Sequence, residues 1–350
     1  LKQFRFRDPR SLTMDAMPQW RHSSQVALCL AAGFAGGVAG AYSYHALQGN
    51  KSTPQTLLRL LRESLPQRVI LVRHGESEAN VDPSMWRKKA DNLLGLSPTG
   101  HEQARAVGER ILRLIGDETV AFVVSPFFRT IQTLRGIRAA WRGSGATQGW
   151  VQVDAQLREQ EFGNLQGDDF QKFREQQSHI GRFYYRFPTG ESGADVYDRT
   201  KQWWNNDLLR VNSHYMSEPV NNVIVVTHGL TMRFILMVVN QWSPRSFESI
   251  WNAKNCAMWV LKKDLSLPGP SPYRLDTEEG DKVASTRCVC VFFKDGTKQS
   301  LVLEGYLTIQ PPRTRQVKAM LAAQHGIVPE TVDRIDIDNC RSENLLPLDI

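Results

Sequence analysis

The fold class of this chain is decided by the stretch Val69-Ile-Leu-Val-Arg-His-Gly-Glu76. Its first half is a continuous apolar run rich in β-branched residues, which is typical of a strand buried on both faces of a sheet. Its second half places Arg73 and His74 directly after that strand. Because ligands bind at the carboxyl ends of strands in open α/β sheets, we expect these two side chains at a binding site.

Further apolar runs alternate with helical segments along the chain after this stretch. The pattern predicts strands over residues 69–72, 120–124, 222–227 and 258–262, and helices over residues 97–115, 127–141, 168–178, 193–212 and 230–240. Ser97 and Pro98 are a typical helix start, because serine caps the first turn and proline fits its first position. This alternation predicts a three-layer α/β domain over residues 68–265, with a largely parallel sheet and helices on both faces.

Polar motifs follow each of the first three predicted strands. Arg129 follows the second strand in the motif SPFFR, and His228 follows the third in the motif THG. Between them, the segment LREQEFG at residues 157–163 offers the carboxylates of Glu159 and Glu161, and Asn80 follows the first strand in the motif RHGESEAN. Because the carboxyl ends of parallel strands meet at one edge of a sheet, we expect these side chains to converge.

The converging side chains are of the types that phosphoryl transfer requires. A neutral imidazole such as that of His74 is a good nucleophile toward phosphorus near pH 7, and the phosphoramidate it forms hydrolyses readily. Charge on the phosphoryl oxygens requires fixed donors, which Arg73, Arg129 and the ring N–H of His228 supply. Glu159 can protonate the departing oxygen if burial raises its pKa, and the same carboxylate can then activate water.

Residues close to these side chains complete the predicted site. Gly75 and Gly229 are expected to let the backbone approach the phosphoryl oxygens. Glu161 is a rival of Glu159 as the proton donor, and the residues alone leave that choice open. Asp198 and Arg199 are expected to pair on an exposed helix surface.

In combination, the motifs resemble the histidine phosphatase superfamily, in the branch that contains cofactor-dependent phosphoglycerate mutases and their phosphatase relatives. The resemblance covers residues 67–262 and implies a phosphoglycerate-mutase-like sheet that requires no metal; we also expect no cofactor. It implies that His74 is the phosphorylated histidine and Glu159 the proton donor. The remaining residues of the phosphate pocket that the resemblance implies are Arg73, Asn80, Arg129 and His228.

Two segments narrow the resemblance, LREQEFGNLQG at residues 157–167 and FYYRFPTGESGADVYDR at residues 183–199. They look like the broad-specificity, plant- and fungal-type phosphoglycerate-mutase-like proteins. True mutases carry further basic residues after the proton-donor loop, which bind the substrate carboxylate, and their pattern is not found here. The absence of this pattern favours a phosphatase over a mutase. Its substrate stays open between a phosphoprotein and a small phosphometabolite, because the variable loops around residues 84–95 and 164–190 form the pocket walls.

The N-terminal part of the chain predicts a membrane anchor. Residues 1–22 form a basic, irregular arm. Residues 24–46 include a run without charge at residues 26–44, which nearly spans a hydrocarbon core of about 30 Å. The glycines in that run have the spacing that lets membrane helices approach closely, in the pairs Gly33 with Gly37 and Gly36 with Gly40. We therefore expect a single transmembrane helix that packs against a partner protein, followed by a connector over residues 47–67.

Mitochondria, and their inner membrane in particular, are the expected compartment. The sequence begins without methionine, its first residues are basic and its predicted span is rich in glycine, which together fit an imported membrane protein. The arrangement is similar to that of mitochondrial membrane-anchored phosphatases of the same superfamily. Basic residues flank the span on both sides, so the sequence does not indicate the orientation of the helix.

Composition excludes some other classes of protein. The chain has 350 residues, of which 41% are hydrophobic and 23% charged, as is typical of a globular protein. Its net charge of +7 suits anionic small molecules or lipid headgroups. No stripe of basic residues interleaved with aromatic ones indicates nucleic acid binding. The 5 cysteines are widely scattered without zinc spacing, so we expect no metal site and a reducing compartment.

The chain changes character after residue 265. Residues 266–284 combine a Pro/Gly/Ser stretch with an acidic patch and predict a linker. Strands over residues 287–293, 300–309 and 331–337, a turn containing Asp295 and Gly296, and a helix over residues 314–325 predict a ββαβ module within residues 285–350. The module carries no chemistry that can be named, so we expect it to serve binding or assembly.

Two functions of different classes fit these observations. The first is a membrane-anchored phosphatase that hydrolyses phosphomonoesters via a phosphohistidine intermediate on His74. The second is a catalytically idle accessory or structural subunit of a mitochondrial membrane protein complex, because a fold can be kept without its activity. A mutase ranks third.

Overall fold

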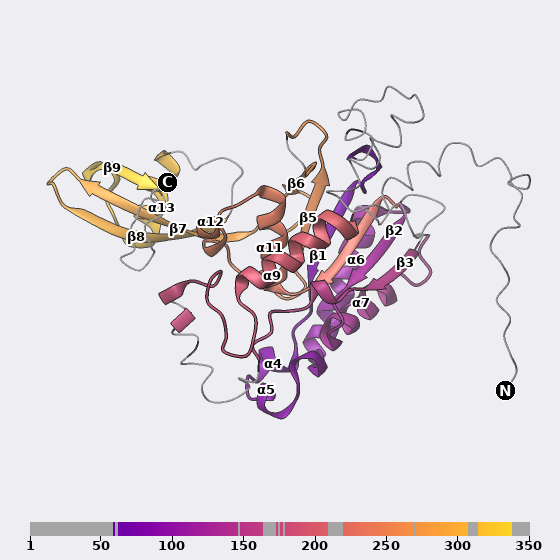
Figure 1. Cartoon of the computed structure of the whole chain (residues 1–350). Helices are drawn as coiled ribbons and strands as arrows, with labels where there is room; N and C mark the ends of the chain where they lie inside the picture. The colour runs from indigo at the N-terminus through magenta and orange to yellow at the C-terminus, as the bar shows by residue number, and fades with distance from the viewer. Residues whose placement is uncertain are drawn as a thin grey trace, which may run out of the picture. The chain divides into compact units, whose positions relative to one another are not determined.

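The structure is a computed structural model that describes residues 59, 62–145, 148–163, 173, 176–177, 179–208, 220–268, 271–306 and 314–337 (Figure 1). The chain divides into two compact units, Leu1–Leu57 and Leu58–Ile350, and the described residues all belong to the second. The expected arm, membrane span and most of the connector lie outside the described residues. Within the described ranges, no helix combines the length and apolar character that crossing a bilayer requires.

The centre of the second unit is a six-stranded sheet in the order β3-β2-β4-β1-β5-β6. Four neighbouring strands are parallel: β3 (Gln148–Val153), β2 (Val120–Val124), β4 (Asn222–Thr227) and β1 (Arg68–Arg73). The two strands beyond β1 run antiparallel: β5 (Met258–Lys263) and β6 (Tyr273–Asp276). Strand β1, which holds the apolar run of the stretch that decides the fold class, therefore has a neighbouring strand on each side, β4 and β5. A central position of this kind is what its uninterrupted apolar run predicts.

Helices cover both faces of this sheet (Figure 1). On one face, Ile70 and Val72 of β1 join a core with α6 (Pro98–Ile115) and α7 (Phe128–Ala140). On the other, Val69 and Leu71 join a core with α11 (Gly229–Asn240) and with η3 (Trp203–Asp207), which continues α9 (Gly193–Gln202). These four β1 side chains are 0% exposed. Truncating such residues to alanine typically costs about 2–5 kcal/mol.

Helix α6 begins directly against the loop that follows β1. The hydroxyl of Ser97 accepts the backbone N–H of Gly100 and donates to the Glu76 carboxylate at 2.6 Å. A Cβ added at Gly100 would collide with the Glu76 backbone, and one added at Gly75 would collide with Gly100. Gly75 is therefore required by the contact with α6. The expectation that it also makes room for a phosphoryl oxygen stays a prediction.

The sheet differs from the expected one in direction and in extent. We expected a largely parallel sheet, but β5 and β6 are antiparallel, because an apolar run encodes burial and not direction. Strand β3 was missed because it lies at an edge and alternates only weakly between buried and exposed residues. The helix expected over residues 193–212 is α-helical only to Gln202 and continues as a π-helix.

The segment expected as a linker, residues 266–284, contributes to the domain instead. It contains β6, and the acidic residues after β6 contact the sheet and α6. Glu279 pairs with Arg68 at 2.9 Å and with Lys262 at 2.6 Å. Asp281 pairs with Arg110 and accepts the backbone N–H of Met258 at 2.7 Å. The acidic patch is thus a set of partners for basic side chains distant in sequence, which its composition alone does not reveal.

Short helices occupy the connections: α4 (Glu78–Val81), α5 (Met85–Lys88), η1 (Asp91–Leu93), η2 (Ala155–Leu157) and α12 (Pro244–Glu248). After the domain, β7 (Ala284–Phe293), β8 (Lys298–Tyr306), α13 (Thr314–His325), η4 (Pro329–Thr331) and β9 (Val332–Ile337) follow in order. The three strands form an antiparallel sheet in the order β8-β7-β9. Val289, Leu303 and Leu321 belong to its own small core.

Candidate active site

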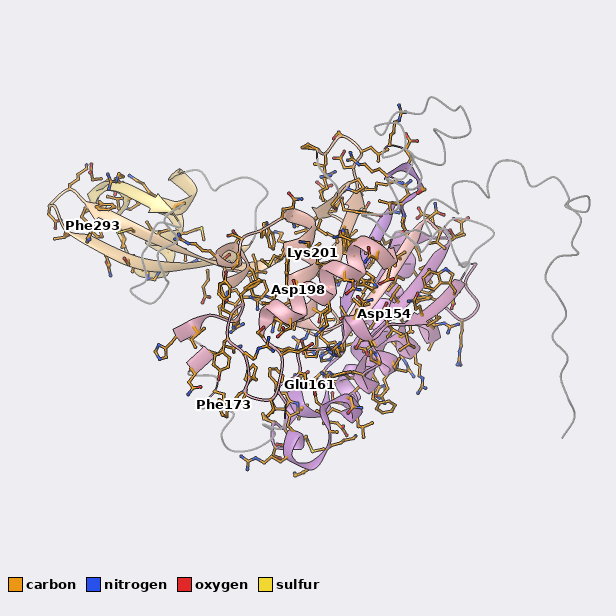
Figure 2. All side chains as sticks on the ribbon, in the orientation of Figure 1. Asp154, Glu161, Phe173, Asp198, Lys201 and Phe293 are labelled. Atoms are coloured by element: carbon orange, nitrogen blue, oxygen red, sulfur yellow. The ribbon has the colours of Figure 1, made fainter. Side chains whose placement is uncertain are left out.

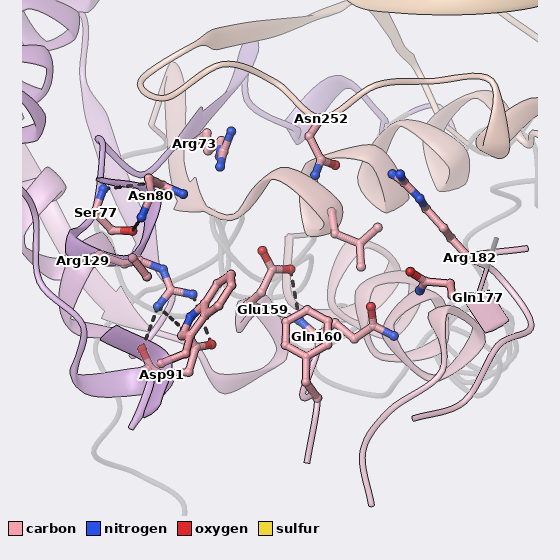
Figure 3. Close-up of a pocket in the computed structure, with 14 residues that line it drawn as sticks. Arg73, Ser77, Asn80, Asp91, Arg129, Glu159, Gln160, Gln177, Arg182 and Asn252 are labelled. Atoms are coloured by element: carbon pink, nitrogen blue, oxygen red, sulfur yellow. Dashed lines mark hydrogen bonds and ion pairs between the residues drawn. The ribbon is translucent and has the colours of Figure 1, made fainter. Parts of the chain in front are cut away.

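A cavity of about 200 Å³ is lined by residues from the loops that follow β1 and β2 and from the loop at residues 158–163 (Figure 3). Four of the six predicted site residues line it: Arg73, Asn80, Arg129 and Glu159. The two histidines, His74 and His228, are buried and do not line it. Their rings lie next to each other, with centroids 5.3 Å apart. The structure thus brings the predicted side chains to one place.

Arg73 ends β1 and presents one unused donor to the site. Its Nη1 donates to the carbonyl of Ala253 at 2.6 Å, which fixes the guanidinium. Its Nε is buried and has no hydrogen-bond partner among the described residues. A Cβ added at Gly229 would lie 3.5 Å from that Nε. A buried donor without a partner is costly, and an anion that accepts its hydrogen bond removes the cost.

His74 is held in a single tautomer by its neighbour. Its Nδ1 lies 2.7 Å from the carbonyl oxygen of Gly75. Because a carbonyl oxygen only accepts, Nδ1 carries the proton and Nε2 keeps its lone pair. Burial, followed by the positive charges of Arg129 and Arg73, holds the pKa of His74 well below its usual range. The ring is therefore neutral at physiological pH, in the form that can attack phosphorus.

His228 is oriented by Ser125, whose role was not foreseen from the sequence. The Ser125 hydroxyl lies 2.8 Å from His228 Nε2 and accepts the backbone N–H of Phe127. When this hydroxyl donates its proton to Nε2, the ring carries its own proton on Nδ1. His228 Nδ1 has no hydrogen-bond partner among the described residues and lies 3.9 Å from Glu159 Oε2. Burial and then Arg129 hold the pKa of His228 well below its usual range.

Arg129 lies in the first turn of α7 and is paired with a carboxylate that sequence reasoning missed. Its Nη1 donates to Asp91 Oδ1 at 2.9 Å and its Nη2 to Asp91 Oδ2 at 3.4 Å. The guanidinium also lies 4.9 Å from the centre of the Phe127 ring. The Arg129 side chain is only 6% exposed, so its pairing with Asp91 is largely shielded from water. A carboxylate therefore engages the arginine that the resemblance assigns to substrate phosphate.

Glu159 and Glu161 have different surroundings. Glu159 lines the cavity, whereas Glu161 is exposed and its backbone pairs with Glu191 (Figures 2 and 3). Burial raises the pKa of Glu159, and the charge of Asp91 adds to this, against the opposing effects of Arg129 and Arg73. A carboxyl group with a raised pKa in a phosphate pocket suits a proton donor.

Asn80 combines a structural contact with its place in the cavity. As the third residue of α4, its side-chain oxygen accepts the backbone N–H of Ser77 at 3.1 Å. The same oxygen accepts from Asn255 Nδ2 at 3.1 Å, and Asn255 also donates to the His74 carbonyl. Asn80 therefore lies at the wall of the cavity as expected and is held by two neighbours.

The loop that carries Glu159 is held by a network around Glu191. The Glu191 carboxylate pairs with Arg158 and Arg199, and Arg199 donates to the carbonyl of Glu159 at 3.1 Å. The Arg199 side chain is only 11% exposed, so the expected surface pair with Asp198 was wrong; Asp198 is exposed on α9 (Figure 2). The helical period of 3.6 residues predicts which side of a helix is buried. It does not predict which of two neighbouring residues at the border of that side is exposed.

Comparison with protein-family models matches residues 69–265 to branch 1 of the histidine phosphatase superfamily. The chain belongs to this superfamily. Within the superfamily, it is 36% identical over 216 residues to a phosphoglycerate mutase-like protein of Arabidopsis thaliana, covering 57% of this chain and 75% of that protein. It is 26% identical over 290 residues to a broad-range acid phosphatase of Saccharomyces cerevisiae, covering 58% and 87%. The resemblance inferred from the motifs is confirmed.

The chain was also compared with solved structures. A mycobacterial glucosyl-3-phosphoglycerate phosphatase in complex with VO3 aligns with a TM-score of 0.47 and 23% identity, covering 60% of this chain and 97% of that one. The family match and the sheet describe a phosphoglycerate-mutase-like α/β domain with a central mixed sheet, of phosphatase type at the level of the family.

Proposed function

We propose that this chain is a phosphatase that hydrolyses phosphomonoesters via a phosphohistidine intermediate on His74. The observation that supports this most directly is the hydrogen bond from His74 Nδ1 to the Gly75 carbonyl, because it leaves Nε2 as the nucleophile. The unpartnered donors Arg73 Nε and His228 Nδ1 are suited to a phosphoryl group beside that nitrogen.

In the first step, His74 Nε2 attacks phosphorus and the bond from phosphorus to the ester oxygen breaks. Glu159, whose raised pKa favours the protonated form, gives its proton to the departing oxygen. Arg73, Arg129 and His228 bind the phosphoryl oxygens, where negative charge is spread in the transition state.

In the second step, water replaces the departed alcohol. The Glu159 carboxylate removes a proton from the water while the water oxygen attacks phosphorus. The bond from phosphorus to His74 Nε2 breaks in the same step. Inorganic phosphate leaves, His74 returns to its neutral form and Glu159 is protonated again. The cycle needs no group beyond these side chains and water.

The proposal is tested by phosphate release from an aryl phosphate and an alkyl phosphate, with the full-length chain. Wild type is expected to hydrolyse both, and His74→Ala to reduce kcat by several orders of magnitude, because no other group takes the phosphoryl. His101→Ala, on the exposed side of α6, is the matched control and should keep wild-type activity. A folded wild-type chain without activity would contradict the proposal and favour the accessory subunit. Equal activity in His74→Ala would contradict the phosphohistidine intermediate on His74.

We further propose that residues 24–46 anchor this phosphatase in a membrane, with the mitochondrial inner membrane as its compartment. The support is the run without charge at residues 26–44 together with the basic residues before it. Gly33, Gly36, Gly37 and Gly40 would form the surface that packs against a partner helix.

A further inference from the structure

The wall of the cavity carries an amide that none of the steps above uses, that of Asn252. This residue lies in the loop between α12 and β5, is exposed to solvent and lines the cavity together with Arg73 and Glu159. Figure 3 shows Asn252 above Glu159, with its amide nitrogen directed down into the cavity. Asn252 belongs to none of the motifs from which the site was predicted.

The loop that carries Asn252 also holds Arg73. The carbonyl of the next residue, Ala253, accepts a hydrogen bond from Arg73 Nη1 at 2.6 Å. A Cβ added at Gly229 would lie 3.1 Å from Asn252 Cγ and 3.5 Å from Arg73 Nε, so these two side chains are neighbours across the bare glycine. Arg73 Nε is the buried donor without a hydrogen-bond partner among the described residues. An anion that accepts from Arg73 Nε therefore lies beside the Asn252 amide.

A buried arginine fixes the direction in which the Asn252 amide points. Arg233 Nη1 donates to Asn252 Oδ1 at 3.4 Å, and Arg233 Nη2 donates to the carbonyl of Phe247 at 2.9 Å. Because a guanidinium only donates, the amide oxygen must face Arg233, and the amide nitrogen must face away from it. Within the described ranges of the chain, no acceptor takes a hydrogen bond from Asn252 Nδ2. Both of its N–H groups are left for a ligand.

The burial of Arg233 is costly for folding. Its side chain is 0% exposed, and no carboxylate in the part of the chain that the structure describes forms an ion pair with it. Burial and then the charge of Arg182 lower the pKa of Arg233 to about 9. The guanidinium lies over the Phe247 ring at 4.2 Å, where an apolar side chain would pack without this cost. Packing alone therefore does not explain an arginine at this position.

We propose that Asn252 Nδ2 donates to a phosphoryl oxygen of the substrate, and that Arg233 is the positioning residue that keeps the amide in this orientation. The inference rests on the proposed phosphatase function, because the phosphoryl group beside His74 is the anion to which Arg73 Nε would donate. The oxygen that accepts from Arg73 Nε, or the next oxygen of the same group, would accept from Asn252.

A neutral donor has an advantage at this position. Arg129 and Arg73 already lower the pKa of Glu159 by their charge, against the effect of burial. A further cation beside the phosphoryl group would lower that pKa more and would make Glu159 a poorer proton donor at neutral pH. The Asn252 amide binds a phosphoryl oxygen without this effect.

The first test compares Asn252→Ala with Asn240→Ala, which changes an exposed asparagine of α11 outside the cavity. The full-length chain hydrolyses an aryl phosphate, and inorganic phosphate is the inhibitor. Asn252→Ala should lower kcat/KM roughly 10- to 100-fold and weaken inhibition by phosphate by a similar factor, as expected when a hydrogen bond to a charged group is lost. Asn240→Ala should match wild type in both. Inhibition by phosphate that is unchanged in Asn252→Ala would overturn the contact with the phosphoryl oxygen.

The second test concerns the positioning role of Arg233. Arg233→Met should keep a urea midpoint of unfolding close to that of wild type, yet lower kcat/KM toward the value of Asn252→Ala. The two substitutions combined should cost no more than Asn252→Ala alone, because Arg233 acts through that amide. Arg245→Met, at an exposed arginine of α12, is the control. Additive losses, or a lowered urea midpoint with unchanged kcat/KM, would overturn the positioning role.

A conservative variant covers the case in which Arg233→Met does not fold. Arg233→Lys keeps the charge and a donor but not the fork, so it should lose less activity than Asn252→Ala. In combination with Asn252→Ala, it should again add no further loss. A further loss in that combination would count against Arg233 as the residue that positions the amide.

A binding measurement separates failure of this inference from failure of the proposed function. Calorimetry gives the affinity of inorganic phosphate for wild type, Asn252→Ala and Asn240→Ala. Binding that is roughly tenfold or more weaker in Asn252→Ala alone would support the contact even if the wild-type chain hydrolyses no ester. Equal affinity in wild type and Asn252→Ala, or no binding to wild type, would overturn it.

Discussion

At the scale of single residues, His74 and Glu159 set the pH range of the proposed reaction. His74 must be neutral to attack, and because its pKa lies well below the usual range, activity falls only under acidic conditions. Glu159 must be protonated to assist the departing oxygen, so activity is lost as pH rises through its raised pKa. The two groups predict a bell-shaped profile of kcat/KM whose basic limb belongs to Glu159.

Replacing Glu159 tests that assignment. We expect Glu159→Gln to abolish the basic limb and to lower kcat by roughly 10²–10⁴ for an alkyl phosphate, the range typical of a lost general acid. The loss should be smaller for an aryl phosphate, whose oxygen departs without a proton. Glu161→Gln, at the exposed neighbouring carboxylate, serves as the control. A basic limb that persists in Glu159→Gln and disappears in Glu161→Gln would reverse the assignment.

Asp91 reduces the net positive charge of the phosphate pocket, because its carboxylate is paired with Arg129. Its carboxylate engages the Arg129 fork, and its charge contributes, after burial, to the raised pKa of Glu159. Asp91→Asn is therefore expected to bind inorganic phosphate roughly tenfold more tightly, about 1.4 kcal/mol, and to move the basic limb to lower pH. Inhibition by phosphate and the pH profile of kcat/KM are the measurements. Unchanged inhibition would mean that substrate does not compete with Asp91 for Arg129.

At the scale of elements, the loop of residues 158–163 depends on α9 for its position. Arg199 of α9 and Glu191, just before that helix, form hydrogen bonds with the backbone of this loop at Glu159 and Glu161. The Glu191 and Arg199 side chains are 14% and 11% exposed, so their pairing is shielded from solvent. A carboxylate removed from such a pair leaves a cation without its partner, which is costly.

The variant Glu191→Gln tests whether the loop of residues 158–163 depends on this ion-pair network for its position. We expect the free energy of unfolding in urea to fall by about 3 kcal/mol, because Arg158 and Arg199 lose their partner. We also expect kcat to fall, because the Glu159 loop is less well held. Asp198→Asn, at the exposed neighbour of Arg199, should change stability by less than about 0.5 kcal/mol. Equal stability of the two variants would argue against the network as the support of the loop.

At the scale of the whole molecule, the proposed anchor and the catalytic unit are separate parts of the sequence. The proposed span, residues 24–46, belongs to the first unit, and the cavity belongs to the second. A chain that starts at residue 58 should therefore keep the kcat/KM of the full chain toward an aryl phosphate. Loss of activity in the shorter chain, with the second unit folded, would show that the first unit contributes to catalysis.

Alkaline carbonate extraction tests the anchor itself. The full chain, expressed in cells, is expected to stay in the membrane pellet, because a helix that spans the bilayer is not released by high pH. The chain that starts at residue 58 should appear in the supernatant. Release of both chains would rule out the transmembrane proposal, whatever the outcome of the activity assays.

The sequence by itself determined the elements that are buried on both sides. Apolar runs predicted β2 and β4 at their observed bounds, and Ser97 with Pro98 predicted the start of α6. The motifs at strand ends predicted that Arg73, Arg129 and Glu159 share a site, because neighbouring parallel strands end at one edge. These features depend on local pattern and on one topological rule, both of which a single sequence contains.

Only the tertiary structure decided which side chains outside the motifs enter the site. Asp91 comes from the short helix η1 and Arg199 from a face of α9, and their contacts depend on chain segments distant in sequence. Strand β6 was likewise hidden in a segment that reads as a linker, because it pairs with β5 and the acidic residue after it, Glu279, pairs with Arg68 and Lys262 elsewhere in the chain. Charged side chains pair with groups that are close in space but distant in sequence. The spacing of charged residues along the chain therefore does not predict which residues they pair with.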